Sequence, residues 1–260
     1  MAFARHGHEP RRQARQDRVA TVVRTRSGRV IAEQVRTFDG AQDTDGRGLG
    51  LSLGSTAPRR EWTLPVAAVE PGTSGSVAIA NFSLRPASVD VALELSGDGV
   101  LAPETIEVPS RSVVRYDPSG RIPVGTAWTA VVQSQSGKVV AESQLASSGG
   151  VATSGAAAAP ARRWALAGAP NRASSAVLAT NRGSTPITVE LRAYVAGDVD
   201  SPTSAPAIAL EPGKTARFDL DEWGIDPDQV LVVSADGPIV VGRETYQGGL
   251  SLALAVPFPG

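Results

Sequence analysis

The segment Trp62–Glu142 is repeated in register as Trp164–Glu244, and this duplication restricts the fold more than any other feature of the chain. The spacing is 164 − 62 = 102 residues at the tryptophans and 181 − 81 = 100 residues at the asparagines Asn81 and Asn181. Further pairs keep this spacing: Pro86 and Pro186, Val89 and Val189, and Arg115-Tyr116-Asp117 and Arg217-Phe218-Asp219. A chain with such a period consists of modules that share one fold.

Each module ends in a pattern typical of a β-hairpin. In Thr126–Leu145, pairs of valines flank a polar turn at Ser136-Gly137, as in two antiparallel strands. The same pattern occurs at Val22–Glu33, whose turn glycine lies 137 − 28 = 109 residues earlier, and at Val232–Glu244 with the turn Asp236-Gly237. The sequence therefore predicts three copies of one hairpin.

Alternation of apolar and polar residues predicts seven short strands in the first complete module. The predicted strands are Trp62–Val66, Ser76–Asn81, Ser88–Leu95, Glu104–Val108, Ser112–Asp117, Ala127–Ser134 and Lys138–Leu145. Pro and Gly interrupt the helical patterns, and only Asp221–Gly224 and Ala156–Ala159 could form a helical turn. Seven strands in roughly 100 residues are typical of an immunoglobulin-like sandwich. We predict an all-β fold of tandem immunoglobulin-like β-sandwiches, with a β-propeller-like fold as the alternative.

These patterns divide the chain into five parts. Residues 1–18 form a basic tail without apolar periodicity, which predicts disorder. Residues 19–61 form a partial module, with the orphan hairpin Val19–Val35 and a connector that carries a short strand at Leu49–Leu53. The complete sandwiches are residues 62–148 and 164–260, joined by a flexible Gly/Ala-rich linker, residues 149–163. Because an isolated hairpin is only marginally stable, we expect the orphan hairpin to dock on the first complete module and to cause weak self-association.

The composition argues against several classes of function. The net charge is −1, so no basic surface for nucleic acid is expected. Cysteine is absent and both histidines, His6 and His8, lie in the tail, so we expect neither Ser-His-Asp catalysis nor a histidine or thiolate metal site. The acidic stretches Asp39–Asp45 and Asp219–Asp228 lack the full spacing of a calcium loop. We predict that the chain is not an enzyme, has no cofactor and requires no metal.

Side chains that recur in the modules are expected to serve the fold. They are Trp62 and Trp164 in the cores, Asn81 and Asn181 bound to loop backbone, and Glu33, Glu142 and Glu244 in the hairpins. Trp128 and Trp223 differ, because neither has a counterpart in the other module and each lies beside a loop. We predict that Trp128 and Trp223 mark a binding face.

The modules share four motifs: the opening tryptophan, the Asn…Pro-x-x-Val-x-Val segment, the Pro-Gly/Ser turn before a basic-aromatic-Asp strand and the Ser-Gly hairpin. Together these motifs resemble an actinobacterial family of uncharacterised exported proteins built from tandem sandwich modules, a domain of unknown function. The resemblance covers Val19–Gly260 and implies a secreted or cell-envelope location, although no signal peptide pattern precedes the modules. We therefore expect a non-catalytic structural or protein-interaction module that binds a protein or cell-wall component, with carbohydrate binding as the alternative.

Overall fold

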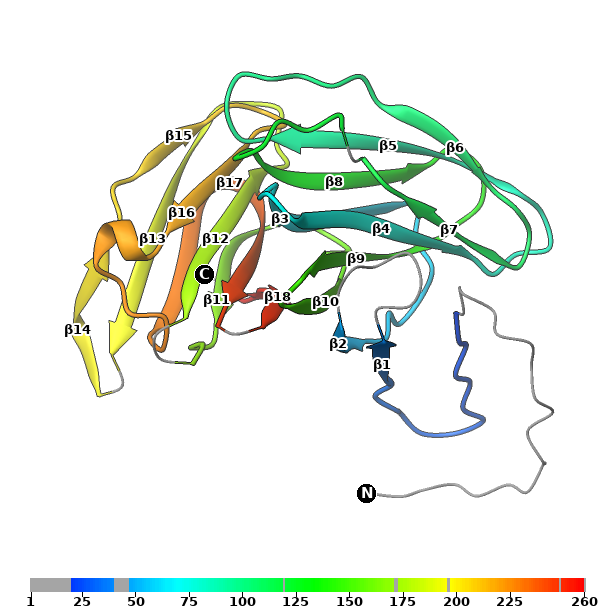
Figure 1. Cartoon of the computed structure of the whole chain (residues 1–260), viewed down its shortest axis with the longest axis horizontal. Helices are drawn as coiled ribbons and strands as arrows, with labels where there is room; N and C mark the ends of the chain where they lie inside the picture. Colours follow the sequence, from blue (N-terminus) through cyan, green and yellow to red (C-terminus); the bar gives the residue numbers. More distant parts are fainter. Residues whose placement is uncertain are drawn as a thin grey trace.

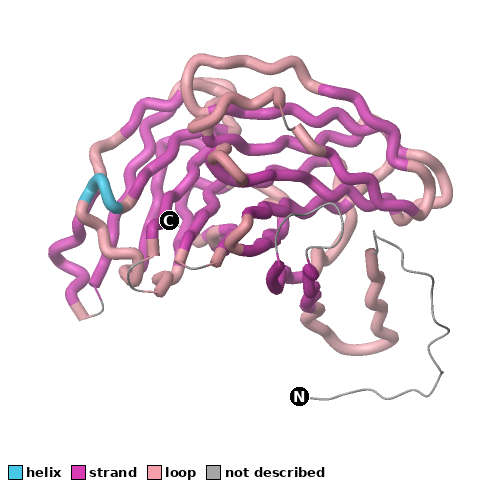
Figure 2. Tube along the Cα trace, viewed as in Figure 1, coloured by secondary structure: helices cyan, strands magenta, loops and turns pink. Residues whose placement is uncertain are grey.

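The computed structural model describes residues 20–39, 47–118, 120–170, 173–195, 197–247 and 249–259. This part of the chain is almost entirely antiparallel β-structure (Figure 1), so the predicted all-β fold is confirmed. Figure 2 shows its single short helix, the 3-10 turn η1 (Asp221–Trp223), at the place where the sequence predicted one. The predicted disordered tail, residues 1–18 with His6 and His8, lies outside the described residues.

The first complete module is a sandwich of two four-stranded antiparallel sheets. Its strands are β3 (Glu61–Ala68), β4 (Thr73–Asn81), β5 (Ala87–Leu95), β6 (Glu104–Val108), β7 (Ser112–Tyr116), β8 (Ala127–Ser134), β9 (Val140–Ser147) and β10 (Gly150–Gly155). One sheet has the order β3-β8-β5-β6 and the other β10-β9-β4-β7. All seven predicted strands are present, and β10 is an unpredicted eighth strand.

The second module repeats this arrangement with one continuous strand in place of two. Its strands are β11 (Ala161–Leu166), β12 (Ser174–Asn181), β13 (Ile187–Val195), β14 (Asp198–Ser204), β15 (Ile208–Leu210), β16 (Thr215–Asp219), β17 (Val230–Tyr246), β18 (Leu250–Leu254) and β19 (Val256–Pro257). The first part of β17 pairs with β11 and β13, and its second part pairs with β12 and β18. β17 therefore takes the places that β8 and β9 hold in the first module.

The hairpins predicted at Thr126–Leu145 and Val232–Glu244 are wrong. β8 lies between β3 and β5, so both of its edges are occupied and β9 cannot pair with it. At Ser136-Gly137 the chain instead crosses to the opposite sheet, where β9 pairs with β4 and β10. The chain makes the same crossing within β17 around Asp236-Gly237. A polar, glycine-containing turn between valine-rich segments fits either arrangement, so the pattern alone could not separate them.

This crossing gives each module a strand order that differs from the immunoglobulin arrangement. There the first strand shares a sheet with the second, and the seventh with the sixth. Here the first strand, β3, shares a sheet with the sixth, β8, and the seventh, β9, shares a sheet with β4. The first and seventh strands have thus exchanged sheets. Each described repeat is one two-sheet sandwich and not two blades, so the alternative β-propeller is not the fold.

Hydrogen bonds of the recurring tryptophans confirm the duplication. Trp62 Nε1 donates to the carbonyl oxygen of Val139 at 2.7 Å, and Trp164 Nε1 donates to that of Ile239 at 2.9 Å. Both indole rings are buried in the cores of their modules, as predicted. Each N–H is directed at the second residue after the crossing turn, so the tryptophan fixes the position where the chain changes sheets.

The recurring asparagines bind loop backbone, also as predicted. Asn81 Nδ2 donates to the carbonyl oxygen of Arg85 at 2.8 Å, and Asn181 Nδ2 donates to that of Thr185 at 2.9 Å. Each Nδ2 also donates to the carbonyl oxygen of the last residue of a neighbouring strand, β6 or β15. One buried amide therefore closes the same loop in both modules.

The Gly/Ala-rich segment 149–163, predicted to be a flexible linker, is ordered. Gly150–Gly155 forms β10, which pairs with β9 along its length and is almost entirely buried. Ala157 then bridges to Thr63 through two backbone hydrogen bonds of 2.8 and 3.1 Å. The residues are small because β10 lies between other strands on both faces, not because the segment must move.

The predicted orphan hairpin Val19–Val35 is displaced along the chain. Residues 20–32 contain no strand, and the hairpin consists of β1 (Glu33–Asp39) and β2 (Arg47–Leu53), which includes the predicted short strand Leu49–Leu53. Its register identifies it as the end of a module, because Glu33 pairs with Leu53 as Glu142 pairs with Gly155. β1 and β2 thus correspond to β9 and β10. As expected, this part of the chain docks on the first complete module, through contact between β2 and β10.

Candidate interaction faces

The two complete modules share a buried joint. Leu178 on β12 is fully buried against Ala68 and Ala127 of the first module. Beside it, the hydroxyl groups of Thr129 and Thr180 hydrogen bond across the joint at 2.7 Å. Contacts of β3 with β12 and β17 extend the joint. Tight packing of this kind fixes the orientation of one module relative to the other.

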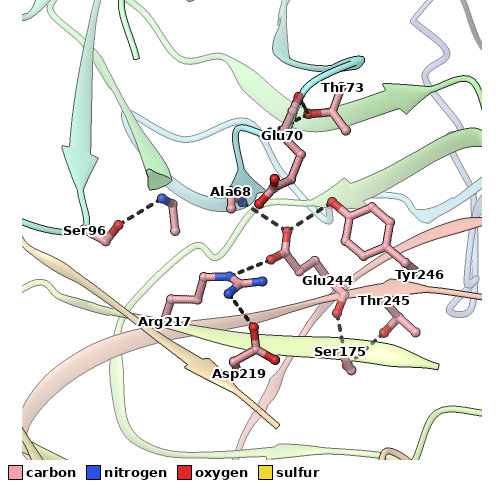
Figure 3. A network of polar contacts seen from close by, with 11 residues as sticks. Ala68, Glu70, Thr73, Ser96, Ser175, Arg217, Asp219, Glu244, Thr245 and Tyr246 are labelled. Carbon is pink, nitrogen blue, oxygen red and sulfur yellow. Dashed lines mark hydrogen bonds and ion pairs between the residues drawn. The ribbon is translucent and has the colours of Figure 1, made fainter. Parts of the chain in front are cut away.

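A buried carboxylate lies at the centre of a polar network in this joint (Figure 3). Glu244, whose side chain is 1% exposed, accepts hydrogen bonds from the Ala68 backbone N–H at 3.1 Å and from Arg217 Nε at 3.0 Å. Arg217 Nη1 also donates to Asp219 at 2.7 Å, and the Tyr246 hydroxyl lies 3.5 Å from Glu244. Burial raises the pKa of Glu244, although Arg217 opposes that rise. Burial and the neighbouring Glu244 carboxylate raise the pKa of Tyr246.

A second set of charged groups crosses the joint at its other side. Arg182 of the second module pairs with Glu94 and with Glu61 of the first. Lys214 Nζ donates to the carbonyl oxygens of Gly97 and Gly99 at 2.8 and 3.0 Å. Burial raises the pKa of Glu94 to about 7, while Arg182 acts in the opposite direction. Glu244 and Glu94, two carboxylates whose pKa values are raised, therefore both bond across the joint and hold the two modules together.

The recurring hairpin glutamate binds the preceding module in both complete copies. Glu244 accepts a hydrogen bond from the Ala68 backbone N–H. Glu142 accepts a hydrogen bond from the Ser52 hydroxyl at 2.9 Å and forms an ion pair with Arg36 at 3.2 Å. The structural role that we predicted for these two residues is therefore confirmed. Glu33, at the matching position of β1, is exposed to solvent.

Three edge hairpins form a row: β1–β2, β9–β10 and β17–β18, with β10 in contact with both β2 and β18 (Figure 1). The outer face of the first hairpin is apolar and uncovered. We call this surface the leucine face; it comprises Val35, Leu49, Leu51 and Leu53, which are 56, 58, 51 and 66% exposed. The opposite side of β2, with Gly50 and Ser52, is buried. An apolar row on the solvent side of a strand is unusual for a closed surface and is typical of an interaction site.

The chain matches one family model over residues 12–251, and that model describes a family of unknown function, DUF5719. The chain belongs to this family. The DUF5719 match confirms the part of the motif resemblance that concerned a domain of unknown function. Comparison with curated proteins gave no match. No helix within the described ranges of this DUF5719 chain is long and apolar enough to cross a membrane.

The two tryptophans predicted to mark a binding face lie in different environments in this DUF5719 chain. Trp128 is 1% exposed and belongs to the first core, so it cannot form part of a surface, and that prediction is wrong. Its ring lies over Gly75, where an added Cβ would approach the ring to 2.6 Å. Trp223, on η1, is 39% exposed, so it remains a candidate binding residue. The structure does not bring the two side chains together.

The acidic stretch Asp219–Asp228 does not gather its carboxylates into one site. Asp219 pairs with Arg217, and Asp221 lies in the first turn of η1. Across the described part of the chain, no three His, Cys, Asp or Glu side chains are grouped so that they could hold a metal ion. Most of the other acidic stretch, Asp39–Asp45, falls outside the described residues.

Proposed function

We propose that this chain is a non-catalytic scaffold of the cell envelope that binds another protein through the leucine face. The exposed row of apolar side chains on β2 is the observation that carries this proposal. The rest of the array supports it, because the buried charged groups join modules and a rigid array presents the leucine face in one orientation. The envelope location rests on the resemblance of the repeated motifs to exported proteins.

Carbohydrate binding, the alternative function, has less support. Sugar-binding surfaces use exposed aromatic rings, and of the two tryptophans proposed for such a surface only Trp223 is exposed. The leucine face has no aromatic ring on its exposed side and offers aliphatic contact area. Aliphatic side chains of this kind fit a protein partner better than a polar sugar.

Photocrosslinking in the native host tests the proposed function. A photoreactive residue at Leu49 is expected to give a discrete adduct that protease treatment destroys and that fractionates with the envelope. The same residue at Leu84, an exposed leucine outside the leucine face, serves as the matched control and should give no such adduct. Absence of a protein adduct from Leu49, or recovery of the chain in the cytosol, would contradict the proposal.

A further inference from the structure

The first two edge hairpins interlock, because a face of small residues on one packs against a face of larger side chains on the other. β2 turns Gly48, Gly50 and Ser52 toward β10. A Cβ added at Gly48 would lie 3.0 Å from the backbone nitrogen of Val151, and one added at Gly50 would lie 2.9 Å from the Thr153 side chain. The larger side chains of β10 thus pack into a face that only small residues can form.

The next two edge hairpins interlock in the same direction. β10 turns its other face, with Gly150 and Ala152, toward β18, and Leu252 of β18 belongs to the buried core cluster that includes Ala152. Leu250 packs against that cluster, and a Cβ added at Gly150 would lie 3.5 Å from the backbone nitrogen of Leu250. In both interlocks, a later hairpin covers the small-residue face of an earlier one with larger side chains, which are Val151 and Thr153 in the first interlock and Leu250 and Leu252 in the second.

Strand register matches the leucine face to side chains of β18. Glu244 pairs with Leu252 on the neighbouring strand, as Glu33 pairs with Leu53. Leu51 and Leu53 therefore correspond to Leu250 and Leu252, the side chains that dock on the first module. The exposed glutamate Glu33 corresponds in turn to Glu244 and Glu142, both of which bond to a preceding module. The first hairpin thus carries the same elements as the two docked edges, and an edge of this kind requires a small-residue surface to dock on.

The other end of the series offers such a surface. The face of β18 that points away from the first module carries Ser251 and Ala253, which are both exposed. By register, Ser251 matches Ser52, the residue whose hydroxyl donates to Glu142 in the internal interlock. Within the described part of the chain, this small-residue face of β18 is therefore exposed, as is the leucine face.

We propose that the leucine face of one chain docks on the small-residue face of β18 in a second copy, with Glu33 accepting a hydrogen bond from the partner's Ser251. This proposal names the partner of the surface in the proposed function and therefore rests on that function. It continues the two interlocks that the chain already contains. The contact is heterologous, so association proceeds from head to tail and is not limited to a symmetric dimer.

One difference from the internal interlocks makes this contact weaker. Beside β18, β17 carries the buried Arg243 opposite Ala253, where β9 carries Ala141. The Arg243 guanidinium donates to the Ser175 hydroxyl and to the carbonyl oxygens of Ala167 and Pro227, so loops of the second module occupy space there. We therefore expect association that depends on concentration, with dimers and longer assemblies in exchange with monomers.

Analytical ultracentrifugation over a range of concentrations tests the proposal. Leu51→Asp and Ala253→Arg each place a charge on one of the two faces, and each should weaken self-association about tenfold or more. Both positions are exposed, so the variants should fold, and circular dichroism checks this. Leu84→Asp, at an exposed position outside both faces, should associate like the wild type.

A mixture of the two variants gives the decisive result. Leu51→Asp keeps an intact β18 face and Ala253→Arg keeps an intact leucine face, so the mixture should form dimers at concentrations at which each variant alone is monomeric. A wild-type chain that stays monomeric at all concentrations would overturn the proposal, even if crosslinking at Leu49 still identifies another protein partner. Association abolished by Leu51→Asp but unchanged by Ala253→Arg would also overturn it, because the leucine faces would then meet each other.

Discussion

Replacing Trp128 by alanine is expected to lower the free energy of unfolding by about 3–5 kcal/mol. The indole ring is 1% exposed and lies within the first core. Gly75 lies directly beneath it, and a glycine cannot extend a side chain into the space that the ring leaves. The cavity therefore persists after the substitution, and its cost adds to the lost burial of apolar surface. Chemical denaturation followed by circular dichroism measures the effect.

Trp223→Ala is the matched control for that substitution. Its ring is 39% exposed on a short 3-10 turn, so we expect a change of about 0.5 kcal/mol or less. Equal losses of stability in the two variants would show that Trp128 is not a core residue, and a negligible loss in Trp128→Ala would lead to the same conclusion.

Replacing Arg217 by methionine is expected to cost about 3–5 kcal/mol at neutral pH, because it leaves the buried Glu244 carboxylate without its ionic partner. Burial already raises the pKa of Glu244, and loss of Arg217 removes the charge that opposes this rise. A carboxyl whose pKa is higher in the folded than in the unfolded protein binds more protons when folded, so stability falls as the pH rises. The destabilisation should therefore be larger at about pH 8 than at about pH 5.

Two further variants show whether the buried charge causes the loss. Adding Glu244→Gln to Arg217→Met removes the charge, so it should restore part of the stability and abolish the pH dependence of the difference. Arg192→Met removes the partner of Glu190 from an exposed ion pair and should change stability by about 0.5 kcal/mol or less. A loss that is equal at both pH values would contradict the role of Glu244 as an uncompensated buried carboxylate.

Periodicity predicted β5 and β6 well, because burial alternates along both strands. β6 and β8 begin and end where the sequence placed them, and β5 alternates between buried and partly buried residues along its length. The structural roles of Asn81 and Asn181 were also predictable, since a polar residue repeated at the same point of two modules must serve what the modules share.

Properties that depend on pairing between distant segments could not be predicted in the same way. The turn Ser136-Gly137 has hairpin chemistry, but β3 occupies the edge that a hairpin partner would need. β10 could not be predicted because Gly, Ser and Thr occupy most of its positions, so the strand lacks an alternating apolar pattern. Trp128 was predicted to lie on a surface because it does not recur, although its ring fills the space above Gly75 in the first core.

Calorimetry of the wild type and of Trp128→Ala shows whether the modules interlock and unfold as one cooperative body. Because Leu178, Glu244 and Arg182 tie the second module to the first, we predict a single transition in each protein. The calorimetric and van't Hoff enthalpies should agree, and the whole transition should move to lower temperature in the variant. If Trp128→Ala shifts only part of the heat absorption and leaves a second transition at the wild-type temperature, the modules unfold independently and the prediction is wrong.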